Sequence, residues 1–520
     1  MNGAQALIRT LADSGVQVCF ANPGTSEMHF VAALDTVPEM RGVLCLFEGV
    51  ATGAADGYGR MTGTPAAALL HLGPGLGNGI ANLHNARRAR TPLVTVVGDH
   101  ATSHKRLNAP LESDIDSLAW PVSAWVRRSL RTADVAADAA EAVAATAGGV
   151  ATLILPADVS WTDGASPAPP VSPRPQSPAP PAVIEEAVKA LRSGEPCTIL
   201  LGASGLRRTA IEAASRIAEA TGARLLGETF PARHERGAGI PDVPRLAYLG
   251  EFAADQLDGT RHLILAGAAA PVSFFAYPGK PSTLTPNGSS VTVLAAPSDD
   301  VSGTLEALAG LVAPGACPAP HPASRPELPS GPLTAQSAAE VIGALLPEGA
   351  IVSDEAATSG IFLAAATAGA PPHDWLTLTG GAIGQGLPLA AGAAVACPGR
   401  PVLALEADGS AMYTISALWT HARENLNITT VIFSNRAYAI LGMELNRVGA
   451  AAAAADGTGP GDAAKSLLSL DSPPLDFTAL ARGMGVPATR AATAEDFAAQ
   501  LHTALAEPGP HLIEAVVPAI

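Results

Sequence analysis

Short apolar runs that alternate with helix-like segments constrain the fold of this chain more than any other feature. Examples are "VQVCF" (16–20), "PLVTVVGD" (92–99), "CTILLGA" (197–203) and "VLALEA" (402–407), which are rich in β-branched residues. Strands that are apolar on both faces are typical of parallel sheets covered by helices on both sides. The pattern therefore predicts an α/β protein made of doubly wound parallel sheets.

Two proline-rich stretches divide this pattern into three parts. They are "GASPAPPVSPRPQSPAPPAV" (164–183) and "APGACPAPHPASRPELPSGP" (313–332), and such a composition favours extended connectors over packed elements. A chain of 520 residues is also too long for one core. We expect three α/β domains, at residues 1–163, 184–312 and 333–520.

The net charge, the N-terminal residues, the length of the apolar runs and the cysteines argue against several classes of protein. The net charge of −16 argues against nucleic acid and anionic membranes as partners. The N-terminal residues lack the basic region and apolar run of a signal peptide, and no stretch is long enough to span a membrane. The scattered cysteines form neither a disulfide framework nor a zinc site; they are Cys19, Cys45, Cys197, Cys317 and Cys397. We expect a soluble cytoplasmic protein.

Polar residues stand directly after two apolar runs in the segment 406–438. "VLALE" leads to Asp408 and "TTVIF" leads to Asn435, with the helix-like "MYTISALWTHAREN" between them. If the two strands are neighbours in a parallel sheet, both side chains lie at the same carboxyl edge, where open α/β sheets bind ligands. A carboxylate, an amide oxygen and a loop carbonyl suit Mg²⁺ that also holds phosphates.

Gly409 and Ser410 are predicted to open the crossover helix, whose free N–H groups favour an anion. The alternative is that "ADGS" and "SNR" are an ordinary helix cap and an ordinary turn. "DGS" alone is a weak signal, but the complete strand–DGS–helix–strand–Asn arrangement is much stronger.

The complete segment "ADGSAMYTISALWTHARENLNITTVIFSNRAYAIL" resembles the cofactor signature of thiamine-diphosphate-dependent enzymes. That signature opens with Gly-Asp-Gly-Ser and closes on Asn-Asn. The resemblance implies that Asp408, the side chain of Asn435 and the backbone carbonyl of Ala437 bind Mg²⁺, which clamps the diphosphate. Ala407 stands where the signature has its first Gly, and Ser434 where it has its first Asn. The methyl group of Ala407 is expected to weaken cofactor binding without abolishing it.

The same family needs a carboxylate against the aminopyrimidine ring of the cofactor, and "LCLFEGVATGAADGYGRMTG" (44–63) supplies Glu48 after the strand "GVLCLF". An acid at the end of an apolar strand is poorly solvated and can keep a proton to share with a ring nitrogen. The residues alone would favour a Glu that caps the next helix. The resemblance favours Glu48 as the group that activates the cofactor.

Four other segments resemble parts of the family in the same order along the chain. They are "FANPGTSEM" (20–28), "LLHLGPGLGNGIANLHNA" (69–86), "SDEAATSG" (353–360) and "TLTGGAIGQGLPLAAGAA" (377–394). The last would support the bent cofactor with an isoleucine wedge and a glycine carbonyl. The cofactor-binding residues implied in this way are Asn22, Pro23, Gly24, Ala357, Thr358, Gly381, Ile383, Gly409 and Ser410.

The resemblance extends to the acetolactate synthase and benzoylformate decarboxylase branch of the family. His71 falls where benzoylformate decarboxylase carries one of two catalytic histidines, and Thr25 falls where that enzyme carries a serine. The alternative for His71 is an ordinary polar residue at a strand end. The stretch that should supply the second histidine, "AAAPVSFFAYPGKPS" (268–282), contains none, which argues against aromatic decarboxylation.

The resemblance implies decarboxylation or carboligation of a small-molecule 2-oxo acid, with an aldehyde or a second oxo acid as acceptor. It also implies a homodimer or homotetramer with sites between subunits. Two alternatives remain. One is an acetolactate synthase with FAD in the middle domain, although "LLGASGLRRTAIEAA" (200–214) lacks a complete dinucleotide fingerprint. The other is a weakly catalytic paralogue that binds thiamine diphosphate.

The segment 446–476 combines an alanine run with glycine- and proline-rich stretches. It is either a surface loop with a short helix or a lid that orders over a ligand. The sequence favours neither interpretation.

Overall fold

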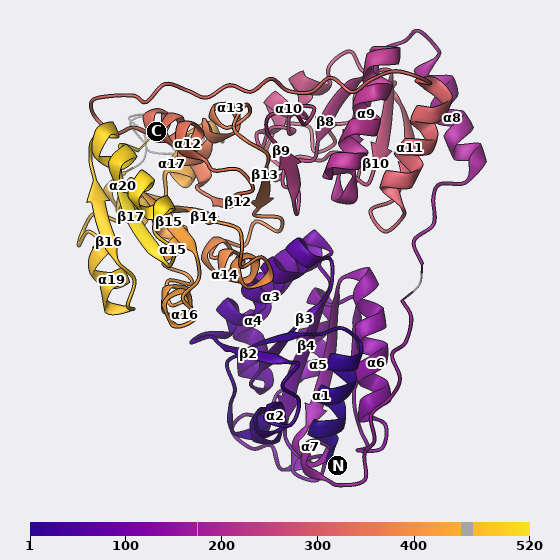
Figure 1. The fold of residues 1–520 in the computed structure, drawn as a ribbon, viewed down its shortest axis with the longest axis vertical. Helices are drawn as coiled ribbons and strands as arrows, with labels where there is room; N and C mark the ends of the chain where they lie inside the picture. The colour runs from indigo at the N-terminus through magenta and orange to yellow at the C-terminus, as the bar shows by residue number, and fades with distance from the viewer. Residues whose placement is uncertain (174, 449–460, 520) are drawn as a thin grey trace.

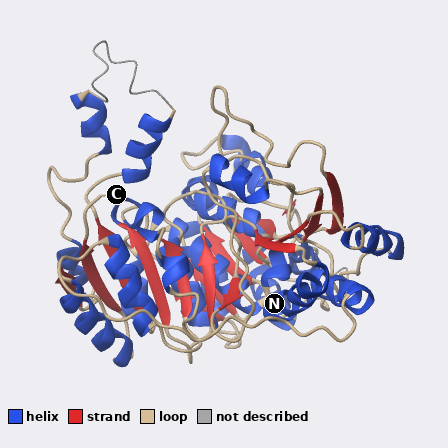
Figure 2. Cartoon of the chain, turned by 90° about the horizontal axis from the view of Figure 1, so that it is seen from above, coloured by secondary structure: helices blue, strands red, loops and turns tan. Residues whose placement is uncertain are grey.

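The computed structural model describes residues 1–173, 175–448 and 461–519. Three mostly parallel sheets follow one another along the chain, each flanked by helices, which confirms the predicted architecture (Figure 1). Figure 2 shows the chain from above, with helices on both sides of the strands. The limits of the three domains stay a prediction.

The first sheet has six parallel strands in the order β2-β1-β3-β4-β6-β5. They are β1 (Val18–Ala21), β2 (Arg41–Leu44), β3 (Ala66–Leu70), β4 (Leu93–Asp99), β5 (Trp125–Arg128) and β6 (Val150–Pro156). One face packs on α1 (Gly3–Asp13), α2 (Met28–Leu34), α6 (Val135–Ala145) and α7 (Ala157–Trp161), and the other on α3 (Glu48–Thr62), α4 (Leu72–Ala89) and α5 (Ile115–Ala119). Alternate strand residues enter the two cores, because successive side chains of a strand point to opposite faces.

The middle sheet has four parallel strands in the order β11-β10-β7-β8. They are β7 (Cys197–Leu201), β8 (Arg224–Gly227), β10 (His262–Ala266) and β11 (Ser290–Ala295). Helices α8 (Pro181–Leu191), α9 (Arg208–Thr221) and α11 (Val301–Val312) share one core with it, and α10 (Gly250–Leu257) packs in another.

The third sheet has seven strands in the order β16-β17-β15-β14-β12-β13-β9. They are β9 (His234–Arg236), β12 (Ile351–Glu355), β13 (His373–Thr377), β14 (Val402–Ala407), β15 (Ile428–Ser434), β16 (Ala488–Ala491) and β17 (His511–Val516). Strand β9 comes from the middle part of the sequence and pairs antiparallel with β13. The predicted parallel sheets are confirmed, and this edge is an antiparallel addition to one of them, because a strand added from a distant loop is free to run in either direction.

Helices cover both faces of the third sheet. One face packs on α12 (Ala335–Leu345), α13 (Leu363–Ala366) and α20 (Ala494–Ala506), and the other on α14 (Gly386–Ala396), α16 (Ala417–Arg423) and α19 (Phe477–Gly483). Three further helices are α15 (Asp408–Ala411), α17 (Ala439–Arg447) and α18 (Asp462–Leu468).

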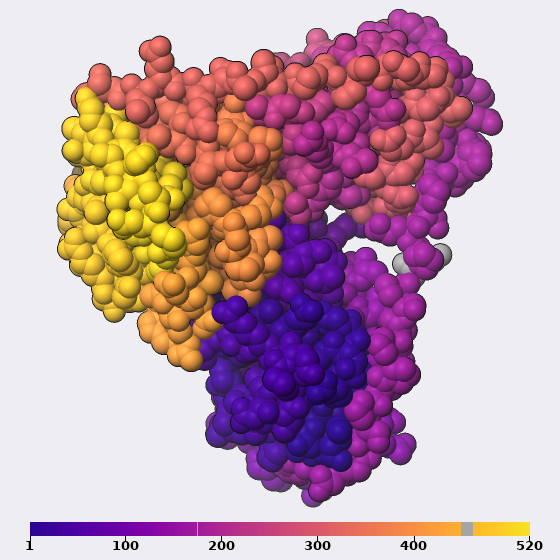
Figure 3. Space-filling model, in the orientation of Figure 1, coloured from indigo at the N-terminus to yellow at the C-terminus, as the bar shows by residue number. Residues whose placement is uncertain are grey.

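The first and third sheets share one continuous apolar core, which passes through α3 and α14. Small residues allow these helices to pack backbone against backbone. A Cβ at Gly57 would lie 2.1 Å from the carbonyl oxygen of Leu389, and one at Gly392 would lie 1.8 Å from that of Ala54. The space-filling view shows the N-terminal part in contact with the C-terminal part, with an opening beside the connector to the middle part (Figure 3).

The two proline-rich stretches contain neither helix nor strand between residues 164 and 173, 175 and 180, and 313 and 331, as predicted for connectors. Within the described residues, no helix combines the length and the apolarity needed to cross a bilayer. Residues 449–460 of the predicted loop or lid lie outside the described residues.

Candidate active site

Asp408 and Asn435 lie at the same edge of the third sheet, as the sequence predicts. Strands β14 and β15 are parallel neighbours, with Ala407 opposite Phe433. The Asp408 side chain is buried and accepts hydrogen bonds from the backbone N–H of Arg436 at 2.6 Å and of Gly409 at 2.8 Å. Burial raises the pKa of this carboxyl, although the N–H donors oppose the shift. A cation bound here would favour the charged form.

The turn after β15 brings the other predicted metal ligands beside this carboxylate. The side-chain oxygen of Asn435 accepts from the backbone N–H of Ala437 at 3.0 Å, and Arg436 between them has a left-handed φ of 59°. One carboxylate, one amide oxygen and one peptide carbonyl are hard oxygen donors, so the residues present fit Mg²⁺. Ala407 has an ordinary extended conformation (φ −76°), so its backbone does not require the glycine of the family signature.

The prediction of one continuous crossover helix between Asp408 and Asn435 is wrong. Helix α15 ends at Ala411, and the chain turns before α16 begins at Ala417. A tertiary contact accounts for the break, because the Thr414 hydroxyl donates to the carbonyl of Gly384 at 3.0 Å. A tyrosine ring also covers the start of α15: a Cβ at Gly409 would lie 2.4 Å from the Tyr438 ring.

The segment 378–385, which carries Gly381 and Ile383, is irregular backbone held by side chains from α4. The Asn82 amide donates to the carbonyl of Gly384 at 3.1 Å. The Asn85 amide donates to the carbonyl of Ala382 at 2.7 Å and accepts from the N–H of the same residue at 3.2 Å. Helix α4 therefore fixes the backbone of a segment that is about 300 positions away in the sequence.

The same segment is also held from the third sheet. Glu355, the last residue of β12, accepts from the N–H of Gly384 at 2.6 Å and of Gly386 at 2.5 Å. Burial raises the pKa of Glu355 to about 7 despite these donors. Ala357 and Thr358 follow at the same carboxyl edge of the sheet, and Ala357 has a left-handed φ of 49°.

Asn22, Glu48 and His71 lie at the carboxyl edge of the first sheet. They follow the neighbouring strands β1, β2 and β3, and Asn22 begins the loop that continues through Pro23 and Gly24. Glu48 is the first residue of α3 and is only 7% exposed. The Asn78 amide of α4 donates to its carboxylate at 3.0 Å.

A second buried carboxylate holds His71. The Glu27 carboxylate accepts from Nδ1 of His71 at 2.8 Å, from the Gly24 N–H at 2.8 Å and from the Ser26 hydroxyl at 2.7 Å. A carboxylate beside Nδ1 fixes the tautomer that leaves Nε2 as the acceptor in the neutral ring. Thr25 is exposed on this loop, and Ser26 rather than Thr25 contacts His71, at 3.4 Å.

The sequence did not single out five residues that position the site: Glu27, Asn78, Asn82, Asn85 and Glu355. A signal was present for the asparagines, because they recur at helical spacing in a segment rich in small and apolar residues, which places them on one face of a helix. Glu27 gives no such signal, since its partner lies on another strand end. Among the described residues, no hydrogen bond joins Thr25, Glu48 or His71 to Asp408 or Asn435.

A cavity of about 280 Å³ lies beside the segment 378–385. Its walls include four aromatic side chains, two cations and two carboxylates: Tyr248, Phe274, Phe275, Tyr277, Lys280, Arg447, Glu251 and Asp255. The Phe274 ring lies 3.2 Å from the position of a Cβ at Gly381, so one wall of the cavity contacts the predicted cofactor segment.

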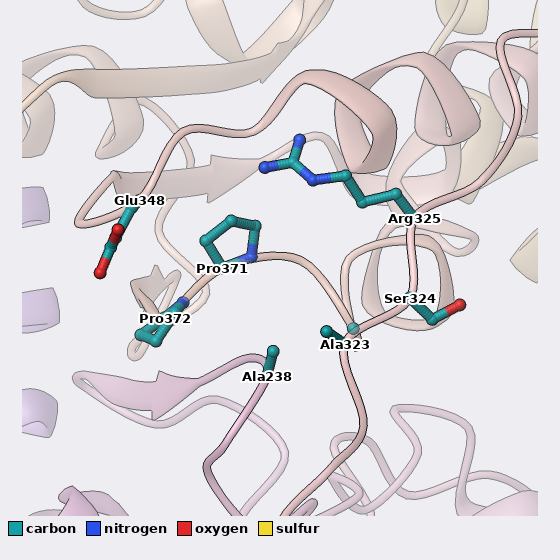
Figure 4. A pocket seen from close by; sticks show the side chains of 8 residues that line it. Ala238, Ala323, Ser324, Arg325, Glu348, Pro371 and Pro372 are labelled. Carbon is teal, nitrogen blue, oxygen red and sulfur yellow. The ribbon is translucent and has the colours of Figure 1, made fainter.

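A larger cavity of about 430 Å³ is lined by Ala323, Ser324 and Arg325 of the second connector, by Ala238, and by the turn at Pro371 and Pro372 (Figure 4). Arg325 and Glu348 are its charged lining residues. None of the predicted site residues lines it, so its size does not make it the candidate active site.

Two family models match the chain: "Thiamine pyrophosphate enzyme, N-terminal TPP binding domain" over residues 1–120, and "Thiamine pyrophosphate enzyme, C-terminal TPP binding domain" over residues 356–515. The first contains Glu48 and His71, and the second contains Asp408 and Asn435.

Relatives and solved structures agree with these matches over the whole chain. The chain is 63% identical to a Mycobacterium tuberculosis protein named "Putative acetolactate synthase large subunit IlvX", over 100% of both chains. It is 31% identical to a benzoylformate decarboxylase of Pseudomonas aeruginosa, over 96% of both. Its structure is similar to a thiamine diphosphate-dependent 4-hydroxybenzoylformate decarboxylase of Rhodococcus jostii, with a TM-score of 0.85 and 26% identity over 100% of both chains.

Proposed function

The chain belongs to the thiamine pyrophosphate enzyme family, and we propose that it uses thiamine diphosphate and Mg²⁺ to decarboxylate a 2-oxo acid, with or without ligation to an aldehyde or a second oxo acid. The observation that carries the proposal is the turn after β15, which brings Asn435 and Ala437 beside the buried Asp408 carboxylate. A cytoplasmic location stays a prediction from the sequence.

Each half of the site has its own task in this proposal. Thiamine diphosphate supplies a carbanion and an electron sink when it is bound. Asp408, Asn435 and the Ala437 carbonyl hold Mg²⁺, and the residues at the strand ends beside them contact the diphosphate. Gly381 and Ile383 support the rings, since their segment is held by α4 and Glu355.

The N-terminal residues handle protons in this proposal. Glu48 contacts the aminopyrimidine ring and exchanges a proton with its ring nitrogen, and its burial beside Asn78 keeps water away from that contact. Glu27 holds Nδ1 of His71, which leaves Nε2 to exchange a proton with the substrate. Thr25 orients the substrate carboxylate. We further propose that the two halves meet between subunits of a homodimer or homotetramer.

The cavity beside Gly381 supports a substrate with a bulky, neutral side chain. Its aromatic walls offer dispersion contacts and ring stacking. Its two cations are already paired: the Glu251 carboxylate accepts from Arg447 at 2.9 Å and also binds Lys280. An acidic side chain would have to compete with Glu251, so a neutral one is preferred. The absence of a second histidine from 268–282 leaves His71 as the proton carrier in this proposal.

The flavin-containing acetolactate synthase is disfavoured by the middle sheet. Ligands of open α/β sheets bind where the strand order reverses, which here is the edge between β7 and β10. Gly202 and Gly267 abut there: a Cβ at Gly202 would lie 2.6 Å from the carbonyl oxygen of Gly267. Glu228 accepts from the N–H of Ala203 at 3.1 Å, which is the type of donor that a pyrophosphate needs. We therefore propose that the middle domain does not bind FAD.

The experiment that tests the proposal is CO₂ release from a panel of 2-oxo acids with aliphatic and aromatic side chains, with thiamine diphosphate and Mg²⁺ added. Glu48→Gln is the inactive variant, and Glu219→Gln, an exposed residue on α9, is the matched control. Release that is lost only in Glu48→Gln supports the proposal. A protein that binds the cofactor and releases no CO₂ from any substrate would favour the weakly catalytic paralogue, and bound flavin would favour acetolactate synthase.

A further inference from the structure

Asp56 and Arg60 form a buried ion pair one turn apart on α3, the helix that begins with Glu48. The guanidinium donates through Nε to one carboxylate oxygen at 2.9 Å and through Nη2 to the other at 2.7 Å. Both side chains are almost fully excluded from solvent, with exposed fractions of 0% for Asp56 and 1% for Arg60. The Thr91 hydroxyl donates to the same carboxylate at 2.5 Å.

The pair reaches both ends of the segment that carries Gly381 and Ile383. At one end, Arg60 donates through Nη1 to the carbonyl of Thr377 at 2.8 Å and through Nη2 to the hydroxyl of Thr379 at 2.9 Å. At the other end, the side-chain amide of Gln385 donates to the Asp56 carboxylate at 2.7 Å. The pair therefore clamps the beginning and the end of this segment.

The segment between the two clamped ends has little stiffness of its own. It forms neither helix nor strand, and Gly381 and Gly384 have left-handed φ angles of 74° and 91°. Glycine loses more backbone freedom on folding than any other residue. Such a segment therefore samples several conformations unless side chains from other elements hold it in one. A buried ion pair is a poor source of stability but a good source of defined geometry when all its donors are satisfied.

We propose that Asp56 and Arg60 are positioning residues, which hold the segment 378–385 in the conformation that supports the bent cofactor. The proposal rests on the proposed function, because the segment matters only if thiamine diphosphate binds there. Arg60 acts through the backbone of Thr377 and the side chain of Thr379, and Asp56 acts through Gln385. Neither residue touches the reacting atoms.

Two variants separate positioning from simple stabilisation. Arg60→Lys keeps the charge opposite Asp56, but an ammonium group cannot reproduce the planar fork that also reaches Thr377 and Thr379. Thr379→Val keeps the shape of the side chain and the whole ion pair, and removes only the hydroxyl, which accepts from Arg60 and donates to the carbonyl of Asn85 at 2.8 Å. Arg490→Lys is the control, because Arg490 pairs with the buried Glu514 at 2.8 Å between β16 and β17.

The first measurement is hydrogen exchange of the peptide 378–385 in the protein without cofactor. The second is the thiamine diphosphate affinity, and the third is kcat and KM for the best 2-oxo acid. We expect Arg60→Lys and Thr379→Val to exchange about tenfold faster in this peptide, to bind the cofactor about tenfold more weakly, and to lose about tenfold in kcat with KM within about twofold. Arg490→Lys should match the wild type.

Unchanged exchange and unchanged cofactor affinity in both variants would overturn the positioning role. An equal rise of exchange throughout the chain would overturn it as well, since it would show a loss of general stability. If the wild type does not bind thiamine diphosphate, the proposed function fails, whereas the exchange of the peptide still decides whether the ion pair holds the segment.

Discussion

His421 offers a test of how burial sets the acid stability of the C-terminal sheet. This histidine of α16 is fully buried, and its Nε2 donates to the carbonyl of Leu387 at 3.0 Å. Burial lowers its pKa from 6.5 to about 4. The folded protein therefore binds fewer protons than the unfolded chain between these two values. The stability associated with keeping His421 buried and neutral is fully present above pH 6.5, and it is lost as the pH falls toward 4.

The size of the effect follows from the two pKa values. At pH 4.5 the unfolded His421 is almost fully protonated, whereas only a minority of folded molecules carry the proton. The difference corresponds to about 2.5 kcal/mol of unfolding free energy relative to pH 7.5. His421→Gln retains a donor for the Leu387 carbonyl and does not titrate. Between pH 7.5 and 4.5 the wild type should lose about 2.5 kcal/mol more than this variant.

The assay is urea unfolding followed by tryptophan fluorescence at a series of pH values, compared between wild type and variant. The buried carboxyls of Glu228 and Glu355, whose pKa values burial raises to about 7, titrate in both proteins and cancel in the difference. His502→Gln, at an exposed histidine of α20, is the control for the exchange of histidine for glutamine itself. A constant gap between wild type and His421→Gln across the range would refute the reasoning.

Three further predictions concern the site. Glu27→Gln removes a charged hydrogen bond to His71 worth about 1.5–3 kcal/mol, so kcat of CO₂ release should fall about 10- to 100-fold with little change in KM; an unchanged kcat would show that His71 needs no charged partner. Gly409→Ala places a methyl group 2.4 Å from the Tyr438 ring, so thiamine diphosphate affinity, measured by calorimetry, should fall about tenfold and recover when Tyr438→Ala is added; no recovery would exclude the clash. Asp408→Asn should raise the Mg²⁺ concentration for half-maximal activity about 10- to 100-fold, and an unchanged requirement would place the ion elsewhere.

The local sequence determined the strands, the edges at which they end and the residues found there. Apolar β-branched runs cannot be solvated on either face, so they predict buried parallel strands, and the next polar residue must lie at a sheet edge. For this reason the sequence alone places Glu48, His71, Asp408 and Asn435 at the carboxyl ends of strands, where the structure has them. The resemblance added the identity of the cofactor, which spacing alone does not give.

The tertiary structure decided what holds those residues. The contacts of Glu27 with His71, of Asn85 with Ala382 and of Arg60 with Thr379 join positions that are 44, 297 and 319 residues apart. The break between α15 and α16 and the antiparallel β9 have the same origin. Hydrogen bonds between distant segments depend on how whole sheets and helices pack, and a local pattern does not encode that packing.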